Sequence, residues 1–135
     1  MAAQLPKLEQ GIDLTPGITC FANQPASLRL RRQALRRHAE LIVSRALGIR
    51  VQLLELDMRG AAHVVLARQL SMYLVHVCCG LNYAEVGRVF NRDRTTAAYA
   101  TAQIEERRES GSFDHAVDSL ERALRSSLRR FDDQP

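Results

Sequence analysis

The sequence predicts an all-α fold, a helix-turn-helix bundle with a flexible N-terminal arm. Apolar residues recur at helical spacing through most of the chain, and glycines at positions 48, 80 and 111 separate the periodic stretches. Residues 82–108 add the pattern of a short helix, a tight polar turn and a second helix. We therefore expect an arm over residues 1–26, a helical domain over residues 27–131 and a tail over residues 132–135.

The helices before this unit follow from their start and stop signals. Ser27 can cap a first helix that runs to about Leu47 and ends at Gly48. A short helix over residues 51–56 and a loop precede a nearly all-apolar helix over residues 61–79. A last helix is expected from about residue 113 to 131, after a break at Gly111 and Ser112. The apolar faces of the long helices predict the core: Leu28, Leu35, Ala39, Ile42, Val43, Ala46, Leu66, Leu70, Tyr73, Leu74, Val77, Val117, Leu120, Leu124 and Leu128.

Residues 82–93 predict the first helix of the unit and its turn. Asn82 and Glu85 have the spacing of a capping box, which starts the helix at Tyr83. The polar run 91–93 then interrupts the apolar face, and Asp93 is placed to accept N–H groups from the next helix.

The second helix is expected to open at Arg94 and to have two faces. Ala97, Ala100 and Ile104 form a narrow packing stripe. This leaves four side chains facing elsewhere near the N-terminal end, where a recognition helix touches base edges: Arg94, Thr95, Thr96 and Tyr99. The other interpretation is an ordinary helix pair with a polar surface. Consecutive threonines are poor helix formers that packing does not require here, which favours the DNA-reading interpretation.

Charge is concentrated around this unit. Residues 28–104 hold twelve arginines against five acidic residues, a net charge of +7, although the whole chain carries only +4. Arginine has a planar fork that matches phosphate and guanine in two-point contacts. The arginines from Arg29 to Arg37 lie near a helix N-terminus, where the helix dipole favours acids. They are therefore expected to serve a partner, either phosphates or an acidic protein surface.

Other site classes lack support in the sequence. Cys20, Cys78 and Cys79 do not have zinc-ligand spacing, and the four histidines are scattered, so no metal or cofactor is expected. No arrangement of nucleophile, base and orienting group indicates an enzyme. We also expect no membrane span and no secretory signal, and thus a cytoplasmic, nucleoid-associated location.

Residues 41–124 resemble the C-terminal DNA-binding domain of the bacterial replication initiator DnaA, its domain IV. LIVSRALGIRVQLLEL, from Leu41, is similar to the leading helix of that family. ARQLSMYL, from Ala67, is similar to its "ARQxAMYL", and AEVGRVFNRDRTTAAYA, from Ala84, is similar to its "xEIGxxFGGRDHTTVxHA". The resemblance implies an all-α domain that binds double-stranded DNA.

Carried over by position, the resemblance implies a set of DNA contacts. Asp93, Arg94, Thr95, Thr96 and Tyr99 would contact bases in the major groove. Arg68, Gln69, Asn82, Tyr83, Ala84 and Arg92 would contact the backbone, and Arg59 is the candidate for the minor groove. The family histidines are replaced by Arg94 and Tyr99, and the turn is one residue shorter, so a changed base preference is expected. No GxxxxGK[ST] loop is present, so we expect a stand-alone domain without the family's ATPase.

Three functions remain open on the sequence. The first is a transcriptional regulator, an activator in particular. Small bacterial proteins with DnaA-like domains include activators of phage-like clusters such as gene transfer agents, which act with a partner protein that engages RNA polymerase. The partner would bind the helix from Arg29 to Arg37, the N-terminal arm or the C-terminal helix, and a second DNA-binding head would add specificity. The second is a replication-control or nucleoid protein that competes with the initiator at its sites. The third is an interaction module that has lost DNA binding. Retention of four family residues disfavours it: Arg68, Gln69, Thr95 and Thr96.

Overall fold

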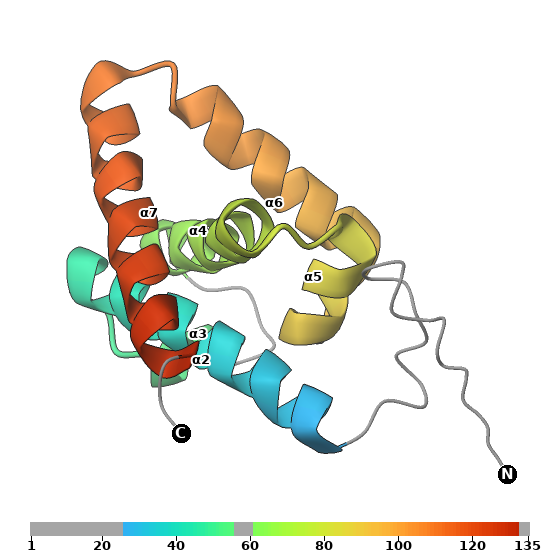
Figure 1. Ribbon diagram of the computed structural model, residues 1–135. Coiled ribbons are helices and arrows are strands. Elements are labelled where there is room, and N and C mark those ends of the chain that lie inside the picture. The colour runs from blue at the N-terminus through green and yellow to red at the C-terminus, as the bar shows by residue number, and fades with distance from the viewer. Residues whose placement is uncertain (1–25, 56–60, 133–135) are drawn as a thin grey trace, which may run out of the picture.

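The computed structural model describes residues 26–55 and 61–132, and all of its regular elements are helices, as predicted. They are α2 (Ala26–Leu47), α3 (Gln52–Glu55), α4 (Ala62–Cys79), α5 (Tyr83–Phe90), α6 (Arg94–Arg107) and α7 (Gly111–Asp132). The long helices α2, α6 and α7 surround α4, and α5 lies at one end of the bundle beside α6 (Figure 1). The expected arm, apart from Ala26, and the end of the tail are outside the described residues.

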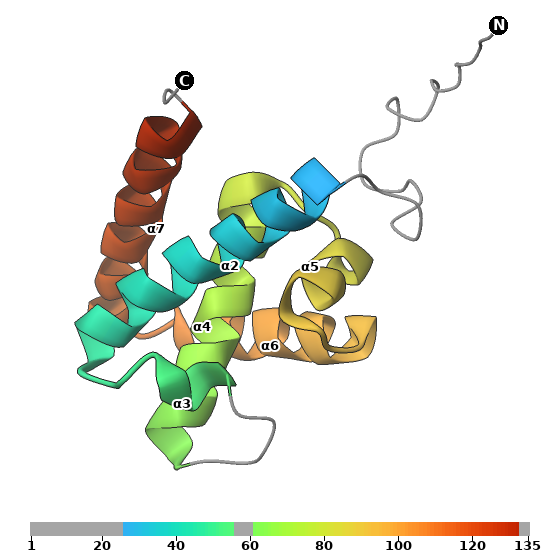
Figure 2. The same cartoon turned by 90° about the horizontal axis from the view of Figure 1, so that it is seen from below.

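Helix α4 forms the centre of the core because most of its residues are apolar. Leu70, Leu74 and Val75 are almost completely buried, and α2, α6 and α7 all pack on this helix (Figure 2). By length and composition alone α4 is apolar enough to cross a membrane. Its packing against three other helices is that of a core helix in a folded domain.

Glycines end two of the helices, as their positions in the sequence predict. Gly48 and Gly80 both have a φ of 69°, the left-handed conformation that glycine adopts without steric cost. The N–H of Gly80 donates to the carbonyl oxygen of His76, which completes the end of α4.

Four expectations from the sequence are wrong in detail. Helix α2 begins at Ala26, so Ser27 lies inside its first turn and does not precede it. Leu28 is 41% exposed because the first buried residue of α2 is Leu35, so the first turns of this helix extend past the core. Ala46 is also exposed. Helix α7 already includes Gly111, because the N–H of a first-turn residue needs no helical partner and a glycine there costs little.

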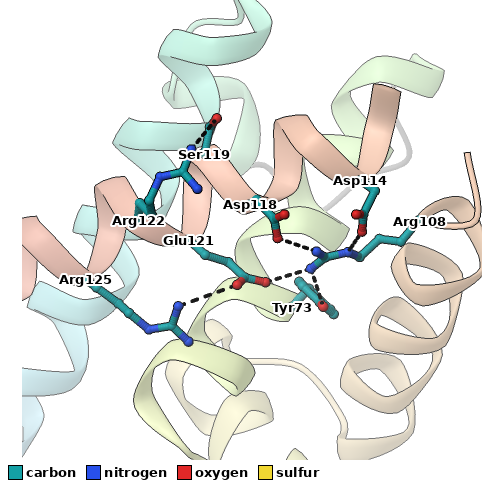
Figure 3. A network of polar contacts seen from close by, with 8 residues as sticks. All are labelled: Tyr73, Arg108, Asp114, Asp118, Ser119, Glu121, Arg122 and Arg125. Carbon is teal, nitrogen blue, oxygen red and sulfur yellow. Dashed lines mark hydrogen bonds and ion pairs between the residues drawn. The ribbon is translucent and has the colours of Figure 1, made fainter. Parts of the chain in front are cut away.

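A network centred on Arg108 joins the end of α6 to α7 and α4 (Figure 3). Its guanidinium donates to one carboxylate oxygen each of Asp114, Asp118 and Glu121, at 2.6, 2.5 and 2.7 Å, and to the hydroxyl of Tyr73 at 3.0 Å. Burial opposes the charge of Arg108, but the hydrogen bonds with these four partners outweigh it and raise the pKa of the side chain. The network ties the end of α6 to α7 and α4, and sequence spacing did not indicate it.

Candidate nucleic-acid interface

The first helix of the unit begins with the capping box that the sequence predicts. The N–H of Glu85 donates to the side-chain oxygen of Asn82 at 2.9 Å, and the N–H of Asn82 donates to the carboxylate of Glu85 at 2.8 Å. Helix α5 therefore starts at Tyr83, as expected. Glu85 is 5% exposed, so its side of this reciprocal pair is sheltered from water, whereas Asn82 is exposed.

His76 holds the entrance to α5, a role that sequence reasoning missed. Its ring Nδ1–H donates to the carbonyl oxygen of Leu81 at 2.6 Å. The same ring stacks on Tyr83, with 4.7 Å between the ring centroids. Because His76 belongs to the core helix α4, it links the start of α5 to the rigid part of the domain.

The turn between the two helices depends on Gly87 and Asn91. The N–H of Arg92 donates to the carbonyl oxygen of Gly87 at 2.7 Å, and Asn91 has a φ of 58°, a left-handed conformation that asparagine tolerates better than most residues. A Cβ at position 87 would lie 2.5 Å from the carbonyl oxygen of Arg92. The close approach of turn and helix therefore requires glycine at this position.

Helix α6 begins at Arg94, as expected, but Asp93 does not cap it in the expected way. Asp93 occupies the N-cap position with an extended backbone, and its side chain makes no capping hydrogen bond. Its carbonyl oxygen accepts from the N–H groups of Thr96 and Ala97. The carboxylate is exposed, which leaves it accessible to a ligand at the N-terminal end of α6.

The two faces of α6 agree with the predicted division. Ala97, Ala100 and Ile104 are 1% exposed or less and pack against α4 and α5. The candidate base-contacting side chains Arg94, Thr95, Thr96 and Tyr99 are all exposed, Tyr99 to 62%. An exposed aromatic ring beside two exposed threonines has no role in the packing of the domain.

A depression follows the turn on the same side of the molecule. It is lined by residues from the end of α5, the turn and the first turn of α6: Gly87, Arg88, Asn91, Arg92, Asp93 and Thr96. It brings together three residues that the resemblance implies, Arg92, Asp93 and Thr96. Arg88 also lines it and was not among the predicted contacts.

The other residues expected at the DNA backbone lie in different settings. Asn82 and Ala84 are exposed at the start of α5, whereas Tyr83 is half-buried under His76. Gln69 is half-buried on α4. The guanidinium of Arg68 donates to the carbonyl oxygen of Leu53 at 3.1 Å, so this side chain also holds α3 against α4. Arg59 lies outside the described residues.

Helix α2 is fixed against the helix-turn-helix by a contact that periodicity did not indicate. The guanidinium of Arg36 lies over the ring of Phe90, 5.4 Å from its centroid. The same side chain pairs with the carboxylate of Glu40 at 3.0 Å, and Glu40 is 4% exposed. The arginine-bearing half of α2 is therefore a fixed neighbour of α5.

Within residues 26–55 and 61–132, no group of three or more His, Cys, Asp or Glu side chains could hold a metal ion. The surface around the turn carries hydrogen-bond donors and acceptors beside arginine side chains, a combination suited to nucleic acid.

Comparisons with known proteins agree with this geometry. Residues 40–104 match the family described as the bacterial dnaA protein helix-turn-helix. Over 65 residues the chain is 43% identical to the chromosomal replication initiator protein DnaA from each of two strains of Thermus thermophilus. The aligned residues make up 47% of this chain and 14% of each relative. The fold matches a crystal structure of a DNA replication initiation factor with a TM-score of 0.64 and 28% identity, over 75% of this chain and 31% of that chain.

The match thus spans a small part of those relatives, and it falls on the segment that forms the helix-turn-helix here. Family and fold together support a DNA-binding role. Residues 40–104 therefore form a helix-turn-helix domain like that of the bacterial DnaA C-terminal family.

Proposed function

We propose that this protein binds double-stranded DNA sequence-specifically through α5 and α6 and acts as a bacterial transcriptional regulator. The observation that carries the proposal is the division of α6, whose small residues are buried while Arg94, Thr95, Thr96 and Tyr99 are exposed at its N-terminal end. This is the end of a recognition helix that contacts base edges.

The exposed side chains suit particular base edges. A threonine methyl group fits the methyl group of thymine, an aspartate accepts from the amino group of cytosine, and an arginine reaches guanine with two hydrogen bonds. Thr95, Asp93 and Arg94 have these roles in the proposal. Asn82, Tyr83 and Ala84 would fix the register at the phosphates, because the first helix of a docked helix-turn-helix crosses the DNA backbone.

A regulator with its own sites is favoured over a competitor of the initiator. Arg94 and Tyr99 stand where the family pattern has histidines, and both are exposed on the reading surface. Competition for initiator sites would favour unchanged reading side chains. We place the protein in the cytoplasm, on the nucleoid, because that is where its proposed ligand is.

A partner protein belongs to the same proposal. A groove between α2, α7 and the end of α4 has three arginines, Arg31, Arg125 and Arg129, around the apolar Leu35, Leu81 and Leu128. This composition fits an acidic segment that carries apolar side chains. Replacing Arg125→Glu and Arg129→Glu is expected to abolish activation of a reporter and to leave duplex binding unchanged. Loss of duplex binding would mean that the groove contacts DNA.

Genome-wide mapping of bound DNA in the source cell tests the regulatory role. Discrete peaks at promoters, with a motif unlike that of initiator sites, are the expected result. Peaks at the replication origin, or equal affinity for initiator sites in a binding assay, would favour the competitor. Absence of peaks together with absence of duplex binding would leave an interaction module.

A further inference from the structure

Two ring side chains meet where α4 ends and α5 begins. His76 lies on the last turn of α4, and Tyr83 is the first residue of α5. Their ring centroids are 4.7 Å apart, with 29° between the ring planes. Such a stacked contact holds the ring of Tyr83 in one orientation. We call these two residues the His76–Tyr83 stack.

The ring of His76 is itself held in place. Its Nδ1 lies 2.6 Å from the carbonyl oxygen of Leu81, and because a carbonyl oxygen can only accept, this nitrogen carries a proton. In the neutral ring Nε2 then has no proton to donate to another group. In that state the histidine supports the ring of Tyr83 and cannot donate to an anion through Nε2.

The hydroxyl of Tyr83 has no role in holding the domain together. Within residues 26–55 and 61–132 it makes no hydrogen bond, and it reaches solvent although the residue is half-buried. The hydroxyl of Tyr73, by contrast, accepts from the guanidinium of Arg108. The ring of Tyr83 packs against the core, which a phenylalanine ring would do as well, so the hydroxyl remains available to a ligand.

The position of this hydroxyl favours a DNA phosphate as its ligand. Tyr83 lies between the exposed Asn82 and Ala84 at the start of α5. When a helix-turn-helix docks on DNA, its first helix crosses the sugar-phosphate backbone while the second enters the major groove. A tyrosine hydroxyl is one of the side-chain groups that donate to phosphate oxygens in such complexes.

We propose that the hydroxyl of Tyr83 donates a hydrogen bond to a backbone phosphate, and that His76 is the positioning residue that holds it there. This inference rests on the proposed function, because it specifies how the start of α5 contacts DNA. A side chain that is ordered before binding loses little rotamer freedom when it binds, so the stack adds affinity. The contact carries no base preference, since it is made to a phosphate.

A double-mutant cycle tests the inference with Tyr83→Phe, His76→Asn and the variant that carries both substitutions. Tyr83→Phe removes the hydroxyl and keeps the ring. His76→Asn removes the stacked ring and keeps an N–H donor for the carbonyl oxygen of Leu81, so the connection into α5 is retained. His115→Asn is the matched control, because it replaces an exposed histidine of α7.

Fluorescence anisotropy gives the affinity of each protein for a duplex that wild type selects from a random library and for an unrelated duplex. Thermal denaturation establishes that every variant is folded at the temperature of the binding assay. Tyr83→Phe and His76→Asn are each expected to weaken binding to both duplexes by about three- to tenfold. The double variant should lose no more than about twofold further.

The slope of log affinity against log salt is expected to stay at the wild-type value in all variants, because a hydroxyl contact releases no counterion. Wild-type affinity in Tyr83→Phe, a loss confined to the selected duplex, or an equal loss in His115→Asn would overturn the phosphate contact. Losses that add in the double variant would overturn the positioning role of His76. Absence of any duplex binding by wild type would instead refute the proposed function.

Discussion

Replacing Gly87→Ala tests whether the close contact at the turn sets the geometry of the reading helix. The added Cβ would lie 2.5 Å from the carbonyl oxygen of Arg92, whereas ordinary contact begins at 3.4 Å, so the turn must move by about 0.9 Å. The obstacle is backbone, which cannot rotate away as a side chain would. Movement also stretches the 2.7 Å hydrogen bond from the N–H of Arg92 to Gly87.

The expected change in the free energy of unfolding is the difference between two destabilising contributions and one stabilising contribution. Overpacking costs about 1–3 kcal/mol, and weakening the backbone hydrogen bond costs up to about 1 kcal/mol. Alanine gains about 0.5–1 kcal/mol over glycine inside a helix. We therefore expect the free energy of unfolding to fall by about 1–3 kcal/mol. Since Thr95 and Arg94 follow the displaced turn directly, affinity for the preferred duplex is expected to fall at least tenfold.

Gly111→Ala is the matched control, because no atom lies within 4 Å of the Cβ that it would add to the first residue of α7. Its stability is expected to be unchanged or raised by up to about 0.5 kcal/mol. Chemical denaturation followed by circular dichroism gives both free energies, and fluorescence anisotropy gives duplex affinity under conditions where both variants are folded. Equal stability and equal DNA binding of the two variants would refute the reasoning.

Two further substitutions and one alkylation experiment test other parts of the structure. Arg108→Gln leaves three carboxylates and the buried Tyr73 hydroxyl without their shared partner. We expect thermal and chemical denaturation to show that its free energy of unfolding falls by about 2–4 kcal/mol. The control Arg125→Gln loses a single exposed ion pair and should lower the free energy of unfolding by less than about 0.5 kcal/mol. Asn82→Ala removes the cap of α5 and should cost about 1 kcal/mol, a loss that Asn82→Ser restores in denaturation curves. Burial raises the pKa of the Cys78 thiol, so less thiolate is present at mildly alkaline pH. Mass spectrometry should therefore show slower alkylation of Cys78 than of a free thiol. Equal alkylation rates would mean that the end of α4 is accessible to solvent.

The parts of the fold that local chemistry determines could be predicted from the sequence. The capping box of Asn82 and Glu85 involves residues three positions apart, and Gly80 ends α4 by its own backbone freedom. The stripe Ala97, Ala100 and Ile104 follows from helical periodicity.

The rest depends on contacts between distant segments. Gly87 needs to be glycine because the turn folds back onto α5. Arg108 meets Tyr73 and the acidic residues of α7 only after α6 and α7 have packed on α4. The contact of Arg36 with the ring of Phe90 depends likewise on how α2 docks. The predicted side-chain cap from Asp93 is wrong. The preference of aspartate for the N-cap position does not fix the direction of its side chain. Here the main-chain carbonyl oxygen of Asp93 accepts the N–H groups of α6 and the carboxylate does not.

The central claim is that the N-terminal end of α6 reads bases. The most direct test measures the binding affinity of wild type, Thr95→Ala and Arg94→Ala for the preferred duplex and for an unrelated duplex. The account predicts that each substitution removes about 1–3 kcal/mol of binding from the preferred duplex and leaves binding to the unrelated duplex nearly unchanged. Folded variants that bind both duplexes as wild type does would contradict it.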